Sequence, residues 1–187
     1  MSIREAQGYA LGPDDGDRAE RGVRRMSLGS GHYTLAAGEG DAFWIAGDLM
    51  TMKAGRAQTG NAFAVGEFVS RPGGGPPPHI HHMEDEAFYV LEGALTGFCG
   101  DQQWEASPGS FIWLPRGIAH AFTVTSDAPA KVLFITAPAG FEYWVAEVAE
   151  PAQALTLPPV PTGPPDLDKW VAAGNKLGLE FRPPPAR

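Results

Sequence analysis

Three of the five histidines in this 187-residue chain lie within four positions, in the segment PPPHIHHMEDEAF. They are His79, His81 and His82. Side chains two residues apart on a β-strand point to the same side. His79 and His81 therefore converge on one point if this segment is extended, whereas His82 faces the other way. Two converging imidazoles suggest a metal site without proving one.

Two later residues can complete such a site. Glu86 lies at an odd offset from His81, so a turn at residues 83–85, which includes Glu84, must start a new strand if Glu86 is to join. His120 follows in LPRGIAHAF. Three imidazoles and a carboxylate suit one divalent ion of Fe, Ni, Co, Mn, Cu or Zn. The alternative is a set of core polar residues in a barrel without metal, but burying them without partners is costly.

Short β-rich runs divided by Gly, Pro and Asp would position these residues. The runs between residues 33 and 136 are FWIAGDLMTMKA, NAFAVGEFVS, AFYVLEGALTGF, GSFIWLP, AHAFTVTS and AKVLFITA. The 24 glycines and 18 prolines together are 42 of the 187 residues. This share is well above the roughly 12% that these two residues make up on average in proteins. The spacing predicts an all-β sandwich or barrel.

Two short helices are expected after these strands. The apolar residues of the first share one helical face: Phe141, Trp144, Val145 and Val148. Residues 151–165 are rich in proline and should be extended. The second helix has Asp166 as its N-cap. Its apolar residues are Leu167, Trp170, Val171 and Leu177. We therefore expect a flexible N-terminal arm at 1–32, a barrel with a short helix at 33–150, and a Pro-rich extension with a helix at 151–187.

The histidine-containing segments resemble the paired motifs of the cupin family. The first motif, Gly, five residues, His-x-His, four residues, Glu, six residues and Gly, is filled by Gly73, His79, His81, Glu86 and Gly93. The resemblance implies a double-stranded β-helix, or jelly-roll, barrel with short C-terminal helices. It also implies that one metal ion is held by His79, His81, Glu86 and His120.

The second cupin motif departs from the family at one position. Gly109, Pro115, Gly117 and His120 match, but Val124 stands where the family has Asn. In the family this Asn is not a metal ligand, so the departure weakens the match little. The residues between the motifs, 94–108, suit the short hairpin of small cupins.

Residues 33–180 also resemble single-domain bacterial cupins related to quercetin 2,3-dioxygenase. The resemblance implies a metal-dependent dioxygenase that acts on a planar hydroxylated aromatic such as a flavonol, with Glu86 taking the substrate hydroxyl proton and dioxygen opening the ring with loss of carbon monoxide. Two alternatives stay open. One is a non-oxidative metal-dependent cupin, such as a cyclase, isomerase or decarboxylase. The other is a non-catalytic cupin that binds a small molecule.

Aromatic and apolar side chains near the ligands are candidates for a substrate pocket, although each also suits a plain core. By alternation, Phe88 and Val90 share the face of Glu86, and Phe122 shares that of His120. The remaining candidates are Phe63, Met50, Met52, Trp113, Phe134, Phe141 and Trp144. Given a planar aromatic substrate, we expect three or four of these candidates to line the pocket.

The charge and composition of the chain limit the kinds of partner and the cellular compartment that we expect for it. The net charge of −8 disfavours nucleic acid and anionic membranes. No apolar run is long enough to span a bilayer. Cys99 is the single cysteine, which excludes an intrachain disulfide and fits a reducing compartment. We expect a cytoplasmic homodimer, paired through an edge strand and the Pro-rich tail, that binds a small aromatic substrate and dioxygen.

Overall fold

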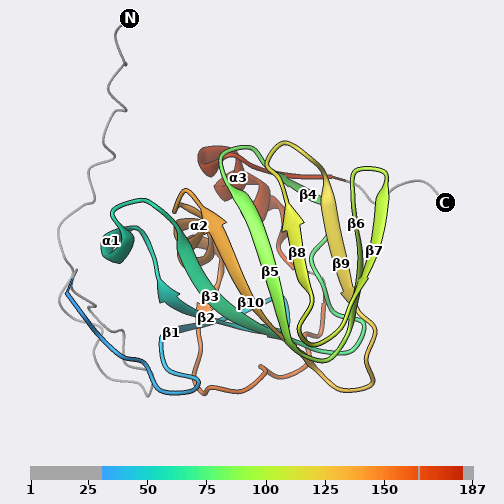
Figure 1. Ribbon diagram of the computed structural model, residues 1–187, viewed down its shortest axis with the longest axis horizontal. Coiled ribbons are helices and arrows are strands. Elements are labelled where there is room, and N and C mark those ends of the chain that lie inside the picture. The colour runs from blue at the N-terminus through green and yellow to red at the C-terminus, as the bar shows by residue number, and fades with distance from the viewer. Residues whose placement is uncertain (1–30, 164, 183–187) are drawn as a thin grey trace, which may run out of the picture.

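The computed structural model describes residues 31–163 and 165–182 (Figure 1). Most of the predicted N-terminal arm lies outside the described residues. Two antiparallel sheets form the body. The first has the order β11-β1-β2-β3-β10-β5-β8, and the second has the order β12-β4-β9-β6-β7. Their facing inner surfaces make the jelly-roll barrel that the motifs predict.

The strands follow the predicted runs closely. Those of the first sheet are β1 (Asp41–Ile45), β2 (Asp48–Ala54), β3 (Ala64–Ser70), β5 (Asp85–Glu92), β8 (Phe111–Leu114), β10 (Ala130–Ala137) and β11 (Glu150–Pro151). Those of the second are β4 (His79–His81), β6 (Leu95–Cys99), β7 (Gln102–Ala106), β9 (His120–Val124) and β12 (Leu179–Phe181). The hairpin expected over 94–108 is β6–β7, and a new strand does begin after His81.

The main core fills the space between the sheets. Burial alternates strictly along β10, where Val132 and Phe134 point inward. Phe68 and Phe122 stack with ring centroids 5.1 Å apart and so join the two sheets. Gly93 turns the chain after β5 with a φ of 78°, and a Cβ there would lie 2.7 Å from the Cα of Ala130. This motif glycine is therefore required by both backbone conformation and space.

The helices are α1 (Arg56–Thr59), α2 (Phe141–Val148) and α3 (Leu167–Leu177). The predicted helical face of α2 is confirmed, with Trp144, Val145 and Val148 buried. Asp166 caps α3 by accepting a hydrogen bond from the Lys169 backbone N–H at 3.0 Å.

The predicted apolar face of α3 is partly wrong. Leu167 and Val171 are exposed, and Ala173 and Gly174 are buried with Trp170 instead. The small residues lie inward because the backbone approaches closely: a Cβ on Gly174 would lie 2.4 Å from the carbonyl oxygen of Leu179. The buried face thus follows the space available rather than residue size.

We call α2, α3 and β12 together the cap. In Figure 1, α3 lies beside α2, and α3 also contacts β12. Strand β12 pairs with β4, so that Leu179 is opposite His81 and Phe181 is opposite His79. A second apolar cluster, which includes Ile45, Trp144 and Trp170, joins the cap to the barrel. Among the described residues, no helix is long and apolar enough to cross a membrane.

Candidate metal centre

Both sheets contribute to one buried cluster. His79 and His81 come from β4 and His120 comes from the neighbouring β9, where it pairs with His79. Glu86 comes from β5 in the opposite sheet. All four side chains are buried, with exposed fractions of 1–7%. The strand alternation and the new strand at Glu86, inferred from sequence, thus bring these four residues together.

The donor atoms of the cluster fit a metal ion. One ligand atom from each residue lies within 4.8 Å of all the others. The Oε2 atom of Glu86 is 3.3 Å from Nε2 of His120 and 4.0 Å from Nε2 of His81. These three atoms are buried without a hydrogen-bond partner. Buried polar atoms normally have partners, so the cluster could hold a divalent ion that satisfies them.

Outer contacts set the tautomers of two histidines. Nδ1 of His79 is 2.9 Å from the carbonyl oxygen of Pro77, and Nδ1 of His120 is 3.0 Å from that of Ile118. A carbonyl oxygen only accepts, so each Nδ1 carries the proton and donates it. Each Nε2 then carries a free lone pair. This is the arrangement that ligating imidazoles usually have.

Burial and neighbouring charges shift the pKa values of the cluster. Burial, aided by the His81 and His120 imidazoles, lowers the pKa of His79 to about 3, so His79 is neutral and able to bind a metal. Burial raises the pKa of Glu86, but contacts with the three histidines outweigh it and lower the pKa overall. Because its pKa is lowered overall, the carboxylate of Glu86 stays ionised. At His81, burial lowers the pKa of the imidazole, whereas the Glu84 and Glu86 carboxylates raise it more, so the net shift is upward.

Comparison with known proteins gives the family. The family described as Cupin domain matches residues 66–136, a segment that contains all four cluster residues. This chain carries a cupin domain. The family and fold inferred from the paired motifs are confirmed.

The chain is similar to parts of two curated relatives and of a solved structure. Quercetin 2,3-dioxygenase of Bacillus subtilis (strain 168) is 27% identical over 126 residues, which are 67% of this chain and 37% of that protein. Protein SchB of Streptomyces halstedii is 30% identical over 74 residues, 40% of this chain and 54% of that protein. The matched segments thus span less than two thirds of either relative. Among solved structures, the polyketide cyclase RemF from Streptomyces resistomycificus is similar over 53% of this chain and 68% of that chain, at 29% identity and a TM-score of 0.43.

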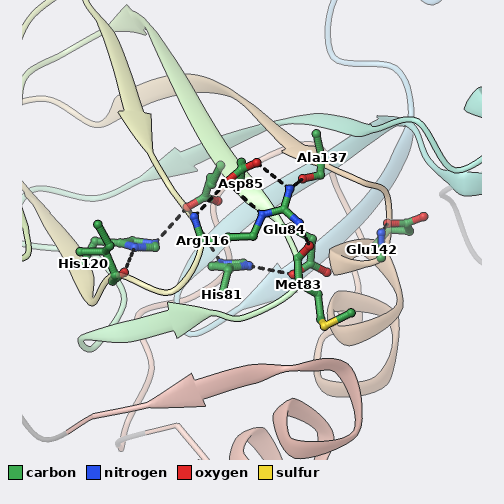
Figure 2. Close-up of polar contacts among 11 residues, drawn as sticks. His81, Met83, Glu84, Asp85, Arg116, His120, Ala137 and Glu142 are labelled. Carbon is green, nitrogen blue, oxygen red and sulfur yellow. Dashed lines mark hydrogen bonds and ion pairs between the residues drawn. The ribbon is translucent and has the colours of Figure 1, made fainter. Parts of the chain in front are cut away.

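A turn between β4 and β5 shapes one side of the cupin cluster. Glu84 lies in this turn with an exposed fraction of 4%, and its Oε2 is 3.5 Å from Nδ1 of His81. Asp85 points away and bonds to Arg116, whose Nη2 donates to Oδ2 at 2.6 Å. Figure 2 shows Glu84 beside His81 and Asp85 beside the guanidinium. The sequence placed Glu84 in a turn but did not reveal its burial.

A cavity of about 90 Å³ adjoins the cluster and is bordered by His79 and Glu86. Six of the ten predicted pocket residues line it: Met50, Phe88, Phe122, Phe134, Phe141 and Trp144. Trp113 is exposed instead. Val90 and Met52 lie instead in the core between the sheets. Phe63 is 41% exposed and borders a separate surface groove with Tyr33 and Leu35. His82 is not in the cluster, since its Nε2 is 2.8 Å from Oε2 of Glu180.

Other lining residues were not anticipated as pocket residues. Trp170, Leu179 and Phe181 reach the cavity from the cap, and the Phe181 ring centroid is 6.2 Å from that of His79. Asp48 adds a carboxylate to an otherwise mainly apolar wall. Burial raises the pKa of Asp48 to about 6, against the opposing effects of Ser70 and Arg71. No local pattern could have shown these long-range contacts.

Proposed function

We propose that this cupin is a metal-dependent dioxygenase acting on a planar hydroxylated aromatic, such as a flavonol. The observation that carries the proposal is the cavity, in which aromatic walls meet His79 and Glu86. An aromatic ring in such a cavity would reach the donor set directly. Similarity to a quercetin 2,3-dioxygenase supports the proposal.

In the proposed centre, His79, His81, Glu86 and His120 would hold the ion. A divalent transition metal in this ligand set supplies Lewis acidity and redox chemistry with open coordination positions. The phenylalanines orient the ring and exclude water. Glu86 accepts the proton of the substrate hydroxyl on its carboxylate, which is ionised beforehand. Asp48, which also lines the cavity, accepts a hydrogen bond from a second substrate hydroxyl.

Substrate entry requires the cap to move. An apolar cavity of about 150 Å³ accommodates benzene, and drug-sized ligands use roughly 300–1,000 Å³. The cavity here is about 90 Å³, so it is too small for a flavonol. Trp144, Trp170 and Phe181 of the cap form part of its wall. Displacement of α2 and α3, with β12 still paired to β4, would enlarge the cavity without disturbing the strands that bear the ligands.

The test is an aerobic assay of the metal-loaded protein with quercetin and simpler phenols. For a flavonol, one dioxygen should be consumed and one carbon monoxide released per ring opened. Chelator-treated protein and an anaerobic reaction are the controls. Product formed without oxygen uptake would favour a non-oxidative enzyme, and tight binding without product would favour a binding protein.

Glu86→Gln tests the proton acceptor. The substitution should lower kcat by roughly 10²–10⁴, the usual contribution of general acid–base catalysis. Three imidazoles remain to bind the metal, so elemental analysis should still find the ion. Substrates that ionise unaided should recover part of the rate at higher pH. Parental turnover would show that Glu86 does not accept the proton.

A further inference from the structure

The three cluster histidines differ in the group that lies next to Nδ1 of each ring. His79 and His120 each contact a backbone carbonyl oxygen two residues earlier through Nδ1. His81 instead has the carboxylate of Glu84 at 3.5 Å from its Nδ1. Its other ring nitrogen, Nε2, faces Glu86 at 4.0 Å. His81 therefore lies between two carboxylates, one on the cluster side and one behind.

The surroundings hold Glu84 in this place. Arg116 clamps the turn from outside: its Nη1 donates to the carbonyl oxygen of Met83 at 3.0 Å, and its Nε donates to Oδ1 of Asp85 at 3.1 Å (Figure 2). Met83 and Asp85, which flank Glu84, are therefore both held by Arg116 on the outer side of the turn. The Gly117 N–H, from the same loop as Arg116, donates to the carbonyl oxygen of His81 at 2.8 Å.

The space around the Glu84 carboxylate depends on a glycine at the start of α2. A Cβ on Gly140 would lie 2.8 Å from Oε1 of Glu84, and no other non-neighbouring group would be as close. Any larger residue there would push the carboxylate. A buried carboxylate is costly without a compensating contact, and its placement beside an imidazole supplies one.

We propose that Glu84 is a positioning residue of the metal centre, which accepts the Nδ1–H of His81 and so orients its Nε2 toward the ion. The inference rests on the metal-binding part of the proposed function and not on the reaction. Carboxylates behind ligating imidazoles fix the ring and strengthen its donation, and their loss typically costs 10–100-fold in metal affinity. Glu84 is not itself in the four-residue donor set.

The experiment is a titration of chelator-treated full-length protein with Co²⁺, followed by calorimetry and visible absorption. Glu84→Gln removes the charge with little change in shape. Gly140→Ala displaces the same carboxylate without altering it. Glu67→Gln is the matched control, because Glu67 is a half-buried carboxylate that pairs with Lys53 and Lys131.

Glu84→Gln should weaken Co²⁺ binding 10–100-fold and shift the ligand-field bands, and Gly140→Ala should do so to a smaller extent. Glu67→Gln should match the parent in Co²⁺ affinity and in the positions of the ligand-field bands. A purely structural role for Glu84 would lower the melting temperature and leave the spectrum unchanged, which would overturn the inference. If Glu84→Gln does not fold, a parental spectrum in Gly140→Ala overturns it. A parent that binds no Co²⁺ overturns the metal centre as well.

Discussion

The cluster of three histidines and Glu86 borders the same cavity as the cap, but the two are held by different forces. The cluster residues project from strands of the barrel that are held by ladder hydrogen bonds. Backbone carbonyl oxygens contact Nδ1 of His79 and of His120. The cap joins the barrel through apolar contacts of Trp144 and Trp170, together with the short β12–β4 ladder.

This difference suggests a division of labour. Strand pairing positions ligands accurately, as a metal site requires. Apolar contacts are less directional, so they allow a wall to open and close again. We therefore expect changes in the barrel to affect metal binding and changes in the cap to affect stability and substrate entry.

The largest effect should come from removing a ligand. His81→Ala should lower Co²⁺ affinity by more than about 100-fold, beyond the cost of losing an outer partner. His82→Ala is the matched control, since His82 is exposed and pairs with Glu180. Calorimetric titration measures both. Equal losses of affinity in the two variants would mean that disturbance of the strand, and not loss of an imidazole ligand, weakens Co²⁺ binding.

A cap substitution should reduce stability and spare the metal. Trp170 is 6% exposed, and replacing a buried tryptophan with alanine typically costs about 3–5 kcal/mol. Trp170→Ala should lower the free energy of unfolding by that order in denaturant titrations. Its Co²⁺ affinity should remain within twofold of the parent. A tenfold loss of affinity would show that cap and cluster are not independent.

Asp48 should give a pH-dependent effect. Its pKa is raised to about 6 in the folded protein, from 3.8 for an ordinary aspartate. Ionised Asp48 therefore destabilises the fold, with a cost that is absent below pH 3.8, grows between these pKa values and is complete above pH 6. Asp48→Asn should add up to about 3 kcal/mol at pH 8. Denaturant titrations at pH 8 and pH 3.5 check this.

The matched control for Asp48 is Asp127→Asn, because Asp127 lies exposed in the loop between β9 and β10. It should change stability little at either pH. A gain for Asp48→Asn of the same size at pH 3.5 would mean that the amide packs better and that ionisation is irrelevant.

The smallest effect concerns the ion pair that links cap and barrel at the surface. His82 and Glu180 are 2.8 Å apart, and both side chains are well exposed. Exposed pairs contribute little because water and salt screen them. Glu180→Gln should leave the melting temperature unchanged in differential scanning calorimetry. A clear drop would mean that polar contacts, and not only apolar ones, hold the cap.

Strand alternation predicted that His79 and His81 converge, whereas Glu86 and His120, which lie on other strands, were joined to them through the paired cupin motifs. His79 and His81 share a strand face, and the spacing to Glu86 demands the turn that the structure contains. Glu84 illustrates the limit: a polar residue in a turn is usually exposed, and only the clamp by Arg116 and the space at Gly140 turn it inward.

The cap shows what such patterns cannot convey. The pairing of β12 with β4 joins residues far apart in sequence, and no periodicity in either segment specifies the partner. The exposed Leu167 and the buried Gly174 reverse the expected order of hydrophobicity on α3. There the deciding factor is the close approach of the Leu179 backbone.

The pairing of β12 with β4 also bears on the order in which the protein assembles during synthesis. The four cluster residues lie between positions 79 and 120, whereas the elements of the cap lie between positions 141 and 181. Synthesis runs from the N-terminus to the C-terminus, so the four cluster residues emerge from the ribosome before Phe181 can take its place opposite His79. An ion can therefore reach the open end of the nascent barrel before the cap covers it. Refolding of the finished chain offers no such interval, because both partners are present from the start.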